Sequence, residues 1–241
     1  MIVSIHQPEY LPWMGYFDKI ARSDIFVILD NVQFQVNGIQ NRVRIKNANG
    51  WQWLTVPVLR KFSQRINEVK IDNSKKWNKK HWHSILANYS KTPHFKKYYD
   101  FFESMYRKEW VRLVELNIFG IKNIMEFLGI KTRIEIASNL DVTGEKNELL
   151  INICKVLDAD VYISGEGALS YLDIKKFQKE GINVKIRSYN HPIYPQQFEK
   201  PDFKKFMSVI DLLFNCGDVS LNMIESGGII DESFSNSGSS R

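Results

Sequence analysis

Cysteine and long apolar runs are both scarce in this chain. Its 241 residues include two cysteines, Cys154 and Cys216, which lie far apart in the sequence. Two unclustered cysteines argue against a disulfide framework and against a cysteine metal site. No apolar run approaches the roughly 20 residues that a membrane-spanning helix needs, and the first residues lack the features of a signal peptide. We therefore expect a cytoplasmic protein with no membrane span.

Several motifs that would indicate a cofactor or a nucleophile are also missing. The sequence has no Gly-x-Gly-x-x-Gly fingerprint of dinucleotide binding. Ser164 does not stand in the Gly-x-Ser-x-Gly pattern of a nucleophile elbow. His81 and His83 have no cysteine or carboxylate partner at zinc-ligand spacing. The sequence thus predicts no metal site and establishes no cofactor.

The net charge of +6 is concentrated in one region. Residues 60–108 carry thirteen lysines and arginines against four acids, which gives this segment +9 and leaves −3 for the rest. Such a segment favours an anionic partner, and the alternative is a solvated, lysine-rich face. Aromatic residues among the lysines could stack on bases, but they fall at helical spacing, which favours packing. We therefore expect an anionic small molecule as partner, and no nucleic acid.

Alternating strand and helix patterns predict an α/β protein. Residues 2–5 and 25–29 have strand patterns on either side of a helical segment, which is a βαβ unit. A second strand–helix–strand alternation covers 145–186. We expect a mainly parallel, Rossmann-like sheet with flanking helices, a β-hairpin insertion and a helical cap. The expected division is an α/β core of residues 1–75 and 129–217, a helical cap of 76–128, and a disordered tail of 225–241.

Polar side chains follow the first two predicted strands at the point where each ends. His6 follows the first, and histidine is the side chain best suited to exchange a proton near neutral pH. Asp30 follows the second. Because parallel neighbours end at the same sheet edge, we predict that Asp30 lies beside His6 and fixes its tautomer. His6 and Asp30 are the predicted catalytic pair; the alternative is that His6 only hydrogen-bonds the backbone of its turn.

Further polar and aromatic side chains stand near other predicted strand ends. The planar guanidinium of Arg42 suits a phosphate or carboxylate, although a strand-edge salt bridge would also explain it. The turn at 164–167 would present backbone N–H groups to an anion, or serve only as a tight turn. The loop at 191–196 is either a ligand wall or structural. The predicted substrate-binding residues are Gln7, Tyr10, Trp13, Tyr16, Gln33, Asn41, Arg42, Ser164, Glu166, Tyr171, Asp173, His191, Tyr194 and Gln196.

The same segments carry a family resemblance. The run His6-Gln7-Pro8-x-Tyr10-Leu11-Pro12-Trp13 resembles the opening signature of the WbqC-like family. Matching blocks recur within 24–34, 41–42, 162–165, 171–173, 194–196 and 208–215. The resemblance covers about residues 1 to 217. Members of this family are associated with bacterial O-antigen (lipopolysaccharide) and other surface-polysaccharide clusters, so the resemblance implies a pathway and leaves the reaction open.

Together these features predict an enzyme that acts on a nucleotide-linked amino sugar. The favoured reaction is acyl or aminoacyl transfer to the sugar amine, with His6 as the base and the donor undetermined. One alternative is an ATP-dependent ligase or nucleotidyltransferase of HUP-like fold using ATP and magnesium. The chain has His6 but lacks the second histidine of the His-x-Gly-His-type signature of those enzymes. The other alternative is a non-catalytic module that binds a glycan or a lipid carrier. The sequence leaves the oligomeric state open.

Overall fold

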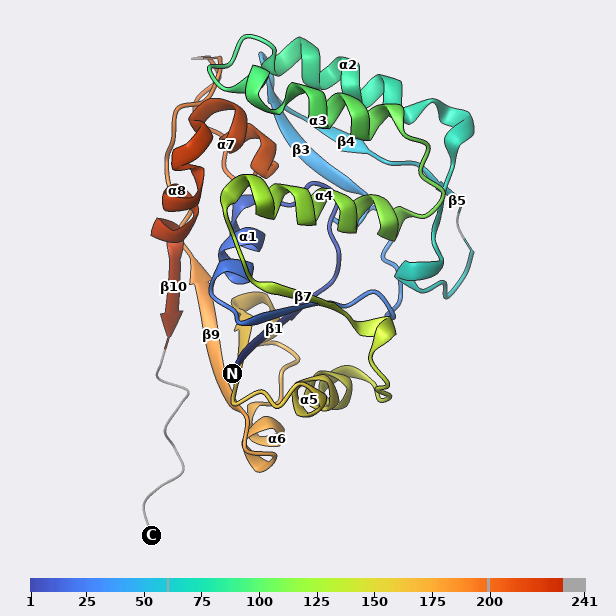
Figure 1. The fold of residues 1–241 in the computed structure, drawn as a ribbon, viewed down its shortest axis with the longest axis vertical. Helices are drawn as coiled ribbons and strands as arrows, with labels where there is room; N and C mark the ends of the chain where they lie inside the picture. Colours follow the sequence, from blue (N-terminus) through green and yellow to red (C-terminus); the bar gives the residue numbers. More distant parts are fainter. Residues whose placement is uncertain (60, 199, 232–241) are drawn as a thin grey trace.

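The computed structural model describes residues 1–59, 61–198 and 200–231. Its centre is a mixed, six-stranded sheet in the order β10-β9-β8-β1-β2-β7 (Figure 1). The parallel strands are β1 (Ile2–His6), β2 (Ile25–Ile28), β7 (Arg133–Ile136), β8 (Val161–Gly165) and β9 (Asn183–Tyr189). The edge strand β10 (Gly228–Asp231) is antiparallel to β9. The prediction of an α/β chain with a mostly parallel sheet is confirmed.

Both faces of the sheet are covered, as a largely parallel sheet requires. Alternate residues of β2 point to opposite faces. Phe26 packs in one apolar cluster with Phe17 of α1 (Met14–Ala21), and Val27 packs in a second with Phe177 of α6 (Ile174–Lys179). Helix α5 (Lys146–Val156) shares the second cluster, and Figure 1 shows α5 and α6 on the opposite side of the sheet from α1.

The order of the strands places a change of direction next to β1. The chain passes from β1 to β2 and then β7 on one side, and later adds β8 and β9 on the other side. The carboxyl ends of β1 and β8 therefore adjoin at the point where the winding reverses. Open α/β sheets bind their ligands outside the strand ends at such a point.

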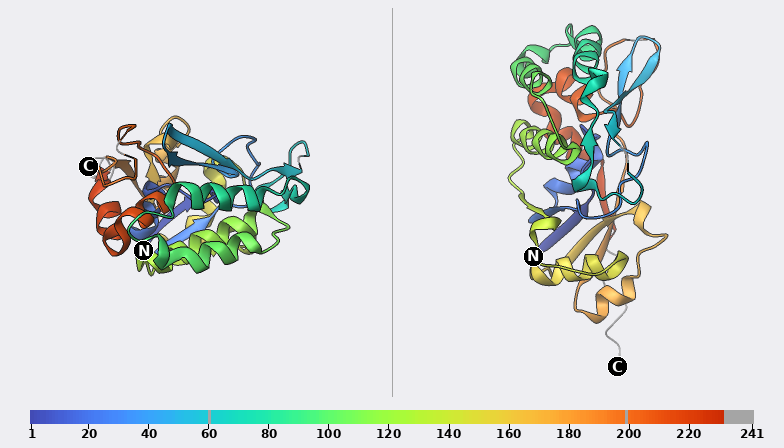
Figure 2. Two further views of the ribbon diagram at one scale, coloured as in Figure 1. Left: turned by 90° about the horizontal axis from the view of Figure 1, so that it is seen from above. Right: turned by 90° about the vertical axis from the view of Figure 1, so that its right-hand side faces the viewer.

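The segment between β2 and β7 forms a second layer over α1. It contains β3 (Arg42–Asn47) paired antiparallel with β4 (Gly50–Thr55), β5 (Val58–Leu59), β6 (Lys70–Ile71), α2 (Trp77–Tyr89), α3 (Phe95–Arg107) and α4 (Leu113–Leu128). Figure 2 shows β3, β4 and α2 at the end of the molecule opposite α5 and α6.

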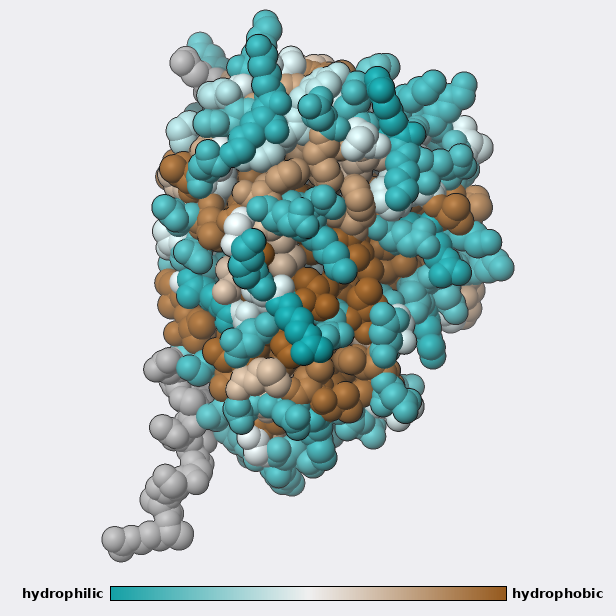
Figure 3. Space-filling view, viewed as in Figure 1, coloured by the Kyte–Doolittle hydropathy of each residue, from teal (hydrophilic) through white to brown (hydrophobic). Residues whose placement is uncertain are grey.

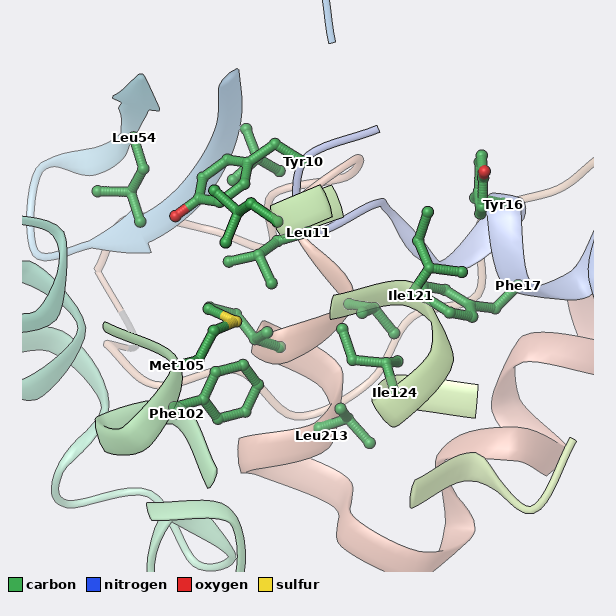
Figure 4. Close-up of a cluster of buried hydrophobic side chains, with 14 of the residues drawn as sticks. Tyr10, Leu11, Tyr16, Phe17, Leu54, Phe102, Met105, Ile121, Ile124 and Leu213 are labelled. Atoms are coloured by element: carbon green, nitrogen blue, oxygen red, sulfur yellow. The ribbon is translucent and has the colours of Figure 1, made fainter. Parts of the chain in front are cut away.

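One continuous apolar core joins this layer to the sheet. In Figure 4, Leu54 of β4, Phe102 of α3 and Ile121 of α4 point toward the same space as Leu213 of α7 (Val209–Cys216) and Phe17 of α1. All five side chains are buried. Residues 76–128 thus share their core with α1 and α7. Their interpretation as a separate helical cap stays a prediction.

The expected disordered tail does not hold for residues 225–231. They form the end of α8 (Ser220–Gly227) and β10. The side chain of Arg22 donates to the carbonyl groups of Glu225 and Gly228, and β10 pairs with β9. Backbone pairing thus holds a segment whose polar composition predicted disorder. The remaining part of that prediction, residues 232–241, lies outside the described residues.

The lysine-rich segment presents its charges to solvent. Lys79, Lys80 and Lys96 are exposed, and polar side chains dominate the surface over α2 and α3 in Figure 3. The aromatic rings of Trp77, Tyr98 and other members of the same helices are buried. Within the described ranges, no helix has the length and apolar character needed to cross a membrane.

Candidate active site

A cavity of about 490 Å³ opens at the carboxyl ends of β1, β8 and β9, where the sheet reverses its winding. Its walls come from the first strand and helix, from the turn after β8, and from β9. The lining includes six of the predicted site residues, namely His6, Trp13, Tyr16, Ser164, Glu166 and Tyr171. It also includes Lys19, Arg187, Tyr189 and Phe206. The structure therefore brings the end of β1 and the 164–171 segment to one site.

His6 is held by its own turn and by a neighbouring ring. Its Nδ1 atom lies 3.1 Å from the carbonyl oxygen of Gln7. Because a carbonyl oxygen only accepts hydrogen bonds, this contact assigns the proton to Nδ1 and the lone pair to Nε2. The ring of Tyr16 packs edge-on at a centroid distance of 5.2 Å, and its hydroxyl donates to the same carbonyl at 3.2 Å. The tautomer that accepts a proton through Nε2 is thus fixed.

The carboxyl group beside His6 belongs to Glu9. Its Oε1 atom lies 3.6 Å from Nδ1 of His6, and its side chain is buried. Asp30, the predicted partner, accepts instead from the backbone N–H and the hydroxyl of Ser138, at 2.9 and 2.6 Å. It lines a different cavity, next to β7. Asp30 leaves the sheet on the β7 side, whereas the site lies on the β8 side, and within the described part of the chain no hydrogen bond or ion pair joins His6 to Asp30.

Two cationic side chains form the inner wall. The Nζ atom of Lys19 is buried and donates to the carbonyl oxygen of Ile5 at 2.9 Å. The Nε atom of Arg187 donates to Asp18, which also accepts from Arg22 at 2.9 Å. The Nη2 atom of Arg187 is buried and has no hydrogen-bond partner among the described residues. The inner wall therefore offers positive charge and an unsatisfied donor.

The electrostatics of the site depart strongly from those of exposed groups. Burial, and then the charges of Lys19 and Arg187, lowers the pKa of His6 to about 3. Burial raises the pKa of Glu9 to about 8, against the opposing charge of Lys19. Burial and Arg187 lower the pKa of Lys19 to about 7. At neutral pH, His6 is neutral, Glu9 is mostly protonated, and Lys19 exchanges its proton easily.

Aromatic rings form the outer wall. The ring of Trp13 contacts those of Tyr189 and Phe206 at centroid distances of 5.2 and 5.3 Å, and it stacks on His191 at 6.4 Å. Trp13 lies directly over Gly15, where an added Cβ would come within 2.2 Å of the ring. Only glycine at position 15 allows Trp13 to occupy this place. Flat apolar walls of this kind suit a sugar or a base.

A second, smaller cavity adjoins the first across Trp13 and Phe206, which line both. Its volume is about 200 Å³, and its other lining residues are Glu9, Tyr10, Ile39, Arg42, Val43, Arg44 and Trp53. Two further predicted residues, Tyr10 and Arg42, are found here. The hydroxyl of Tyr10 is turned inward, at 2.6 Å from that of Tyr106 and 3.0 Å from Nδ1 of His81, so it contributes its ring to the wall.

Several other predicted residues make contacts that hold the fold. The amide oxygen of Gln7 accepts from Gln40 at 2.6 Å, and the amide nitrogen of Asn41 donates to the carbonyl of Val56 at 3.0 Å. Gln33 forms a backbone bridge with Arg65, outside both cavities. These contacts secure the loop between β2 and β3, so binding roles for the three residues stay predictions.

The predicted residues near the C-terminal half behave similarly. Tyr194 and Gln196 both donate to the buried carboxyl group of Asp211, each at 2.8 Å. Asp173 caps α6 by accepting from the backbone of Lys176. His191 is buried behind Trp13, and its Nε2 atom has no hydrogen-bond partner among the described residues. These residues position the wall of the site, and direct binding by them stays a prediction.

Sequence reasoning missed Glu9, Lys19 and Arg187. Lys19 stands among apolar residues of a helix that is buried on nearly every side, and a charged residue in such a helix is a usable signal. Arg187 lies beyond the expected end of its strand, since the predicted strand–helix–strand unit ends at residue 186 and β9 continues to Tyr189. Across the described ranges, no cluster of three or more His, Cys, Asp or Glu side chains could hold a metal ion.

Comparisons with known proteins agree with the sequence pattern. The model of the WbqC-like protein family matches residues 7–223. An uncharacterized protein of Mycobacterium tuberculosis, Rv1507c, is 38% identical over 219 residues, which cover 89% of this chain and 94% of that protein. No solved structure matches the chain. The comparisons therefore establish kinship, and the chemistry must be argued from the site.

Proposed function

This chain belongs to the WbqC-like protein family, and from that premise we propose that it is a cytoplasmic enzyme of bacterial surface-polysaccharide (O-antigen) biosynthesis. The proposed reaction is acyl or aminoacyl transfer to the amine of a nucleotide-linked amino sugar. The strand order, with its reversal between β1 and β8, supports a Rossmann-like interpretation of the sheet.

The observation that carries the proposal is the position of His6 between an acid and two cations. Its proton sits on Nδ1, which leaves Nε2 as the acceptor, and Glu9 lies 3.6 Å behind the ring. Lys19 and Arg187 line the same cavity. A neutral base beside the guanidinium of Arg187 and the partly protonated amine of Lys19 suits a substrate that carries both an amine and anionic groups.

The proposed transfer passes one proton from the sugar amine through His6 to the leaving group. The sugar amine loses a proton to Nε2 of His6 as its nitrogen attacks the carbonyl carbon of the donor. The new C–N bond replaces the bond between that carbon and the leaving group. His6 then returns its proton to the leaving group, as a general acid. Glu166, at the lip of the cavity, would attract the sugar ammonium, which releases one proton to solvent and so becomes the attacking amine.

Substrate binding would itself make His6 a stronger base. Part of the lowered pKa of His6 comes from the positive charges of Lys19 and Arg187. Negative charge brought by the bound substrate would cancel part of their field. The pKa of His6 would then rise, while burial, the larger cause of the shift, would keep it below its ordinary value of 6.5. The enzyme would thus be active chiefly when the anionic substrate is in place.

The proposal is tested by mass spectrometry of reaction mixtures. The purified protein is incubated with nucleotide-linked amino sugars and activated acyl or aminoacyl donors, and the product is sought as an N-acylated nucleotide sugar. His6→Ala should lower turnover by about a hundredfold or more, with the melting temperature unchanged. Lys79→Ala, on the exposed face of α2, is the matched control and should retain turnover. Wild-type turnover by His6→Ala on a verified substrate would refute the proposed role.

A further inference from the structure

One face of the β3–β4 pair carries two arginines and two tryptophans in contact. The guanidinium of Arg42 lies 4.3 Å from the ring centre of Trp53, and that of Arg44 lies 5.2 Å from Trp51 and 5.8 Å from Trp53. Arg44 is directly opposite Trp53 in the strand register. Arginine stacked on an aromatic ring is held in place while its N–H groups still point outward to other partners.

These side chains lack the partners that a purely structural role would supply. Among the described residues, no carboxylate lies within ion-pair distance of Arg42 or Arg44. The Nε atom of Arg42 is buried with no hydrogen-bond partner in the described part of the chain. Trp51 and Trp53 expose 42% and 40% of their surface. The face therefore offers two unpaired cations beside two open rings.

The acidic side chain in the same cavity, Glu9, would not repel a bound anion. Glu9 lines the same small cavity as Arg42 and Arg44. Burial raises its pKa to about 8, so the carboxyl group is mostly neutral at pH 7. Burial also lowers the pKa of Arg44, as expected for a guanidinium partly removed from water without a counter-charge.

Hydrogen bonds of Ser208 fix the position of this face relative to the larger cavity. The backbone N–H of Ser208 donates to the carbonyl of Arg44 at 2.8 Å, and its hydroxyl donates to the carbonyl of Leu11. Two residues earlier, Phe206 has a left-handed backbone with φ of 61° and places its ring against Trp13. Non-glycine residues adopt that conformation only when their surroundings enforce it. Phe206 thus stands at the junction of the two cavities.

We propose that the Arg42–Arg44–Trp51–Trp53 face binds the base and phosphates of a nucleotide. The base would stack on Trp53, with Trp51 beside it, and the phosphates would occupy the small cavity between Arg42 and Arg44. The group linked to the phosphates would pass Trp13 and Phe206 into the larger cavity. This chemistry is common to nucleotide-linked sugars and to coenzyme A thioesters, and only the assignment of the linked group rests on the proposed function.

Isothermal titration calorimetry with UDP, ADP and coenzyme A tests the inference without any turnover. At least one of the three should bind, and Trp53→Ala and Arg44→Gln should each weaken that binding about tenfold or more. Trp53→Phe should retain most of the affinity, because it keeps a ring for stacking. Arg107→Gln on α3 is the control and should bind as the wild type does. Melting temperatures show that each variant is folded.

The outcomes separate this inference from the proposed function. Binding of UDP alone would identify a sugar nucleotide as the occupant, and binding of coenzyme A an acyl donor. Absence of binding by all three, or unchanged affinity in folded Trp53→Ala and Arg44→Gln, would overturn the inference. Nucleotide binding that is weakened by Trp53→Ala and Arg44→Gln, without any acyl transfer, would support the inference and refute the proposed reaction. Acyl transfer by a protein whose nucleotide binding is unchanged by these two substitutions would support the reaction and refute the inference.

Discussion

Nδ1 of His6 lies 3.6 Å from the buried carboxyl group of Glu9, whereas Asp30 is bound to Ser138 beside another cavity. Glu9 is mostly protonated while His6 is neutral, but protonation of His6 would favour the ionised form of Glu9, which in turn stabilises the imidazolium, and glutamine cannot ionise. We therefore expect Glu9→Gln to lower kcat roughly tenfold, with Asp30→Asn closer to the wild type. Steady-state kinetics on a verified substrate checks this, with circular dichroism to confirm folding. A larger loss of kcat in folded Asp30→Asn would restore Asp30 as the partner of His6.

Glu9 should also make stability depend on pH in a definite direction. Its pKa is raised from 4.5 to about 8 on folding, so between these values the folded state binds more protons than the unfolded state. The free energy of unfolding contributed by Glu9 is therefore complete below pH 4.5 and is lost as the pH rises to about 8. Relative to the wild type, Glu9→Gln should become more stable across that window, by on the order of a few kcal/mol.

Urea unfolding of the two proteins at pH 4.5, 6, 7 and 8.5 measures that difference. Titrating groups that do not interact with Glu9 change both proteins alike, so the difference reports Glu9 together with its effect on Lys19, whose pKa the charge of Glu9 raises. Lys19 and His6 have lowered pKa values and act with the opposite sign, because their folded forms bind fewer protons. A difference in unfolding free energy that does not change with pH would show that Glu9 is not perturbed.

Lys19 should control the proton affinity of His6. Its charge is the second cause, after burial, that lowers the pKa of His6. Lys19→Met removes that charge while it keeps an unbranched side chain of similar length, so the pKa of His6 should rise but stay below 6.5. NMR titration of the imidazole signals measures this shift directly. Lys79→Met, on an exposed site of α2, is the matched control. An unchanged His6 titration in Lys19→Met would contradict the prediction.

The main features of the sheet could be predicted because buried parallel strands leave a clear sequence pattern. The first two strands, the helix between them and the second strand–helix–strand unit follow from apolar periodicity. The final strand β10 could not be predicted in this way. It is short, and it is held by pairing with β9 and by Arg22 from α1, contacts that no local pattern encodes.

The site could be predicted only in part, for a related reason. Strand ends indicate which residues reach the edge of the sheet, so His6 and Ser164 were found. Strand ends do not indicate toward which neighbouring strand the following residue turns. Asp30 was therefore predicted beside His6, but it turns toward β7 and binds Ser138. Lys19 differs from a solvated lysine only by the apolar helix around it, and nothing in the sequence distinguishes Arg187 from a solvated arginine. Their role depends on desolvation, which only the packed structure reveals.

Gly15 should be intolerant of even one added methyl group, because Trp13 lies over it. A Cβ at position 15 would come within 2.2 Å of the Trp13 ring, and so the ring must leave the wall that it shares with Tyr189 and Phe206. Gly15→Ala should destabilise the protein by about 1–3 kcal/mol and weaken ligand binding in both cavities, which Trp13 lines. Gly120→Ala in α4 is the matched control, since its Cβ would meet only Leu11 at an ordinary 3.7 Å, and alanine favours a helix. Urea unfolding measures the loss of stability, and isothermal titration calorimetry with a nucleotide that binds the wild type measures the loss of affinity. Equal stability of the two variants would show that Trp13 is free to move, and the wall of the site would then have to be regarded as adaptable.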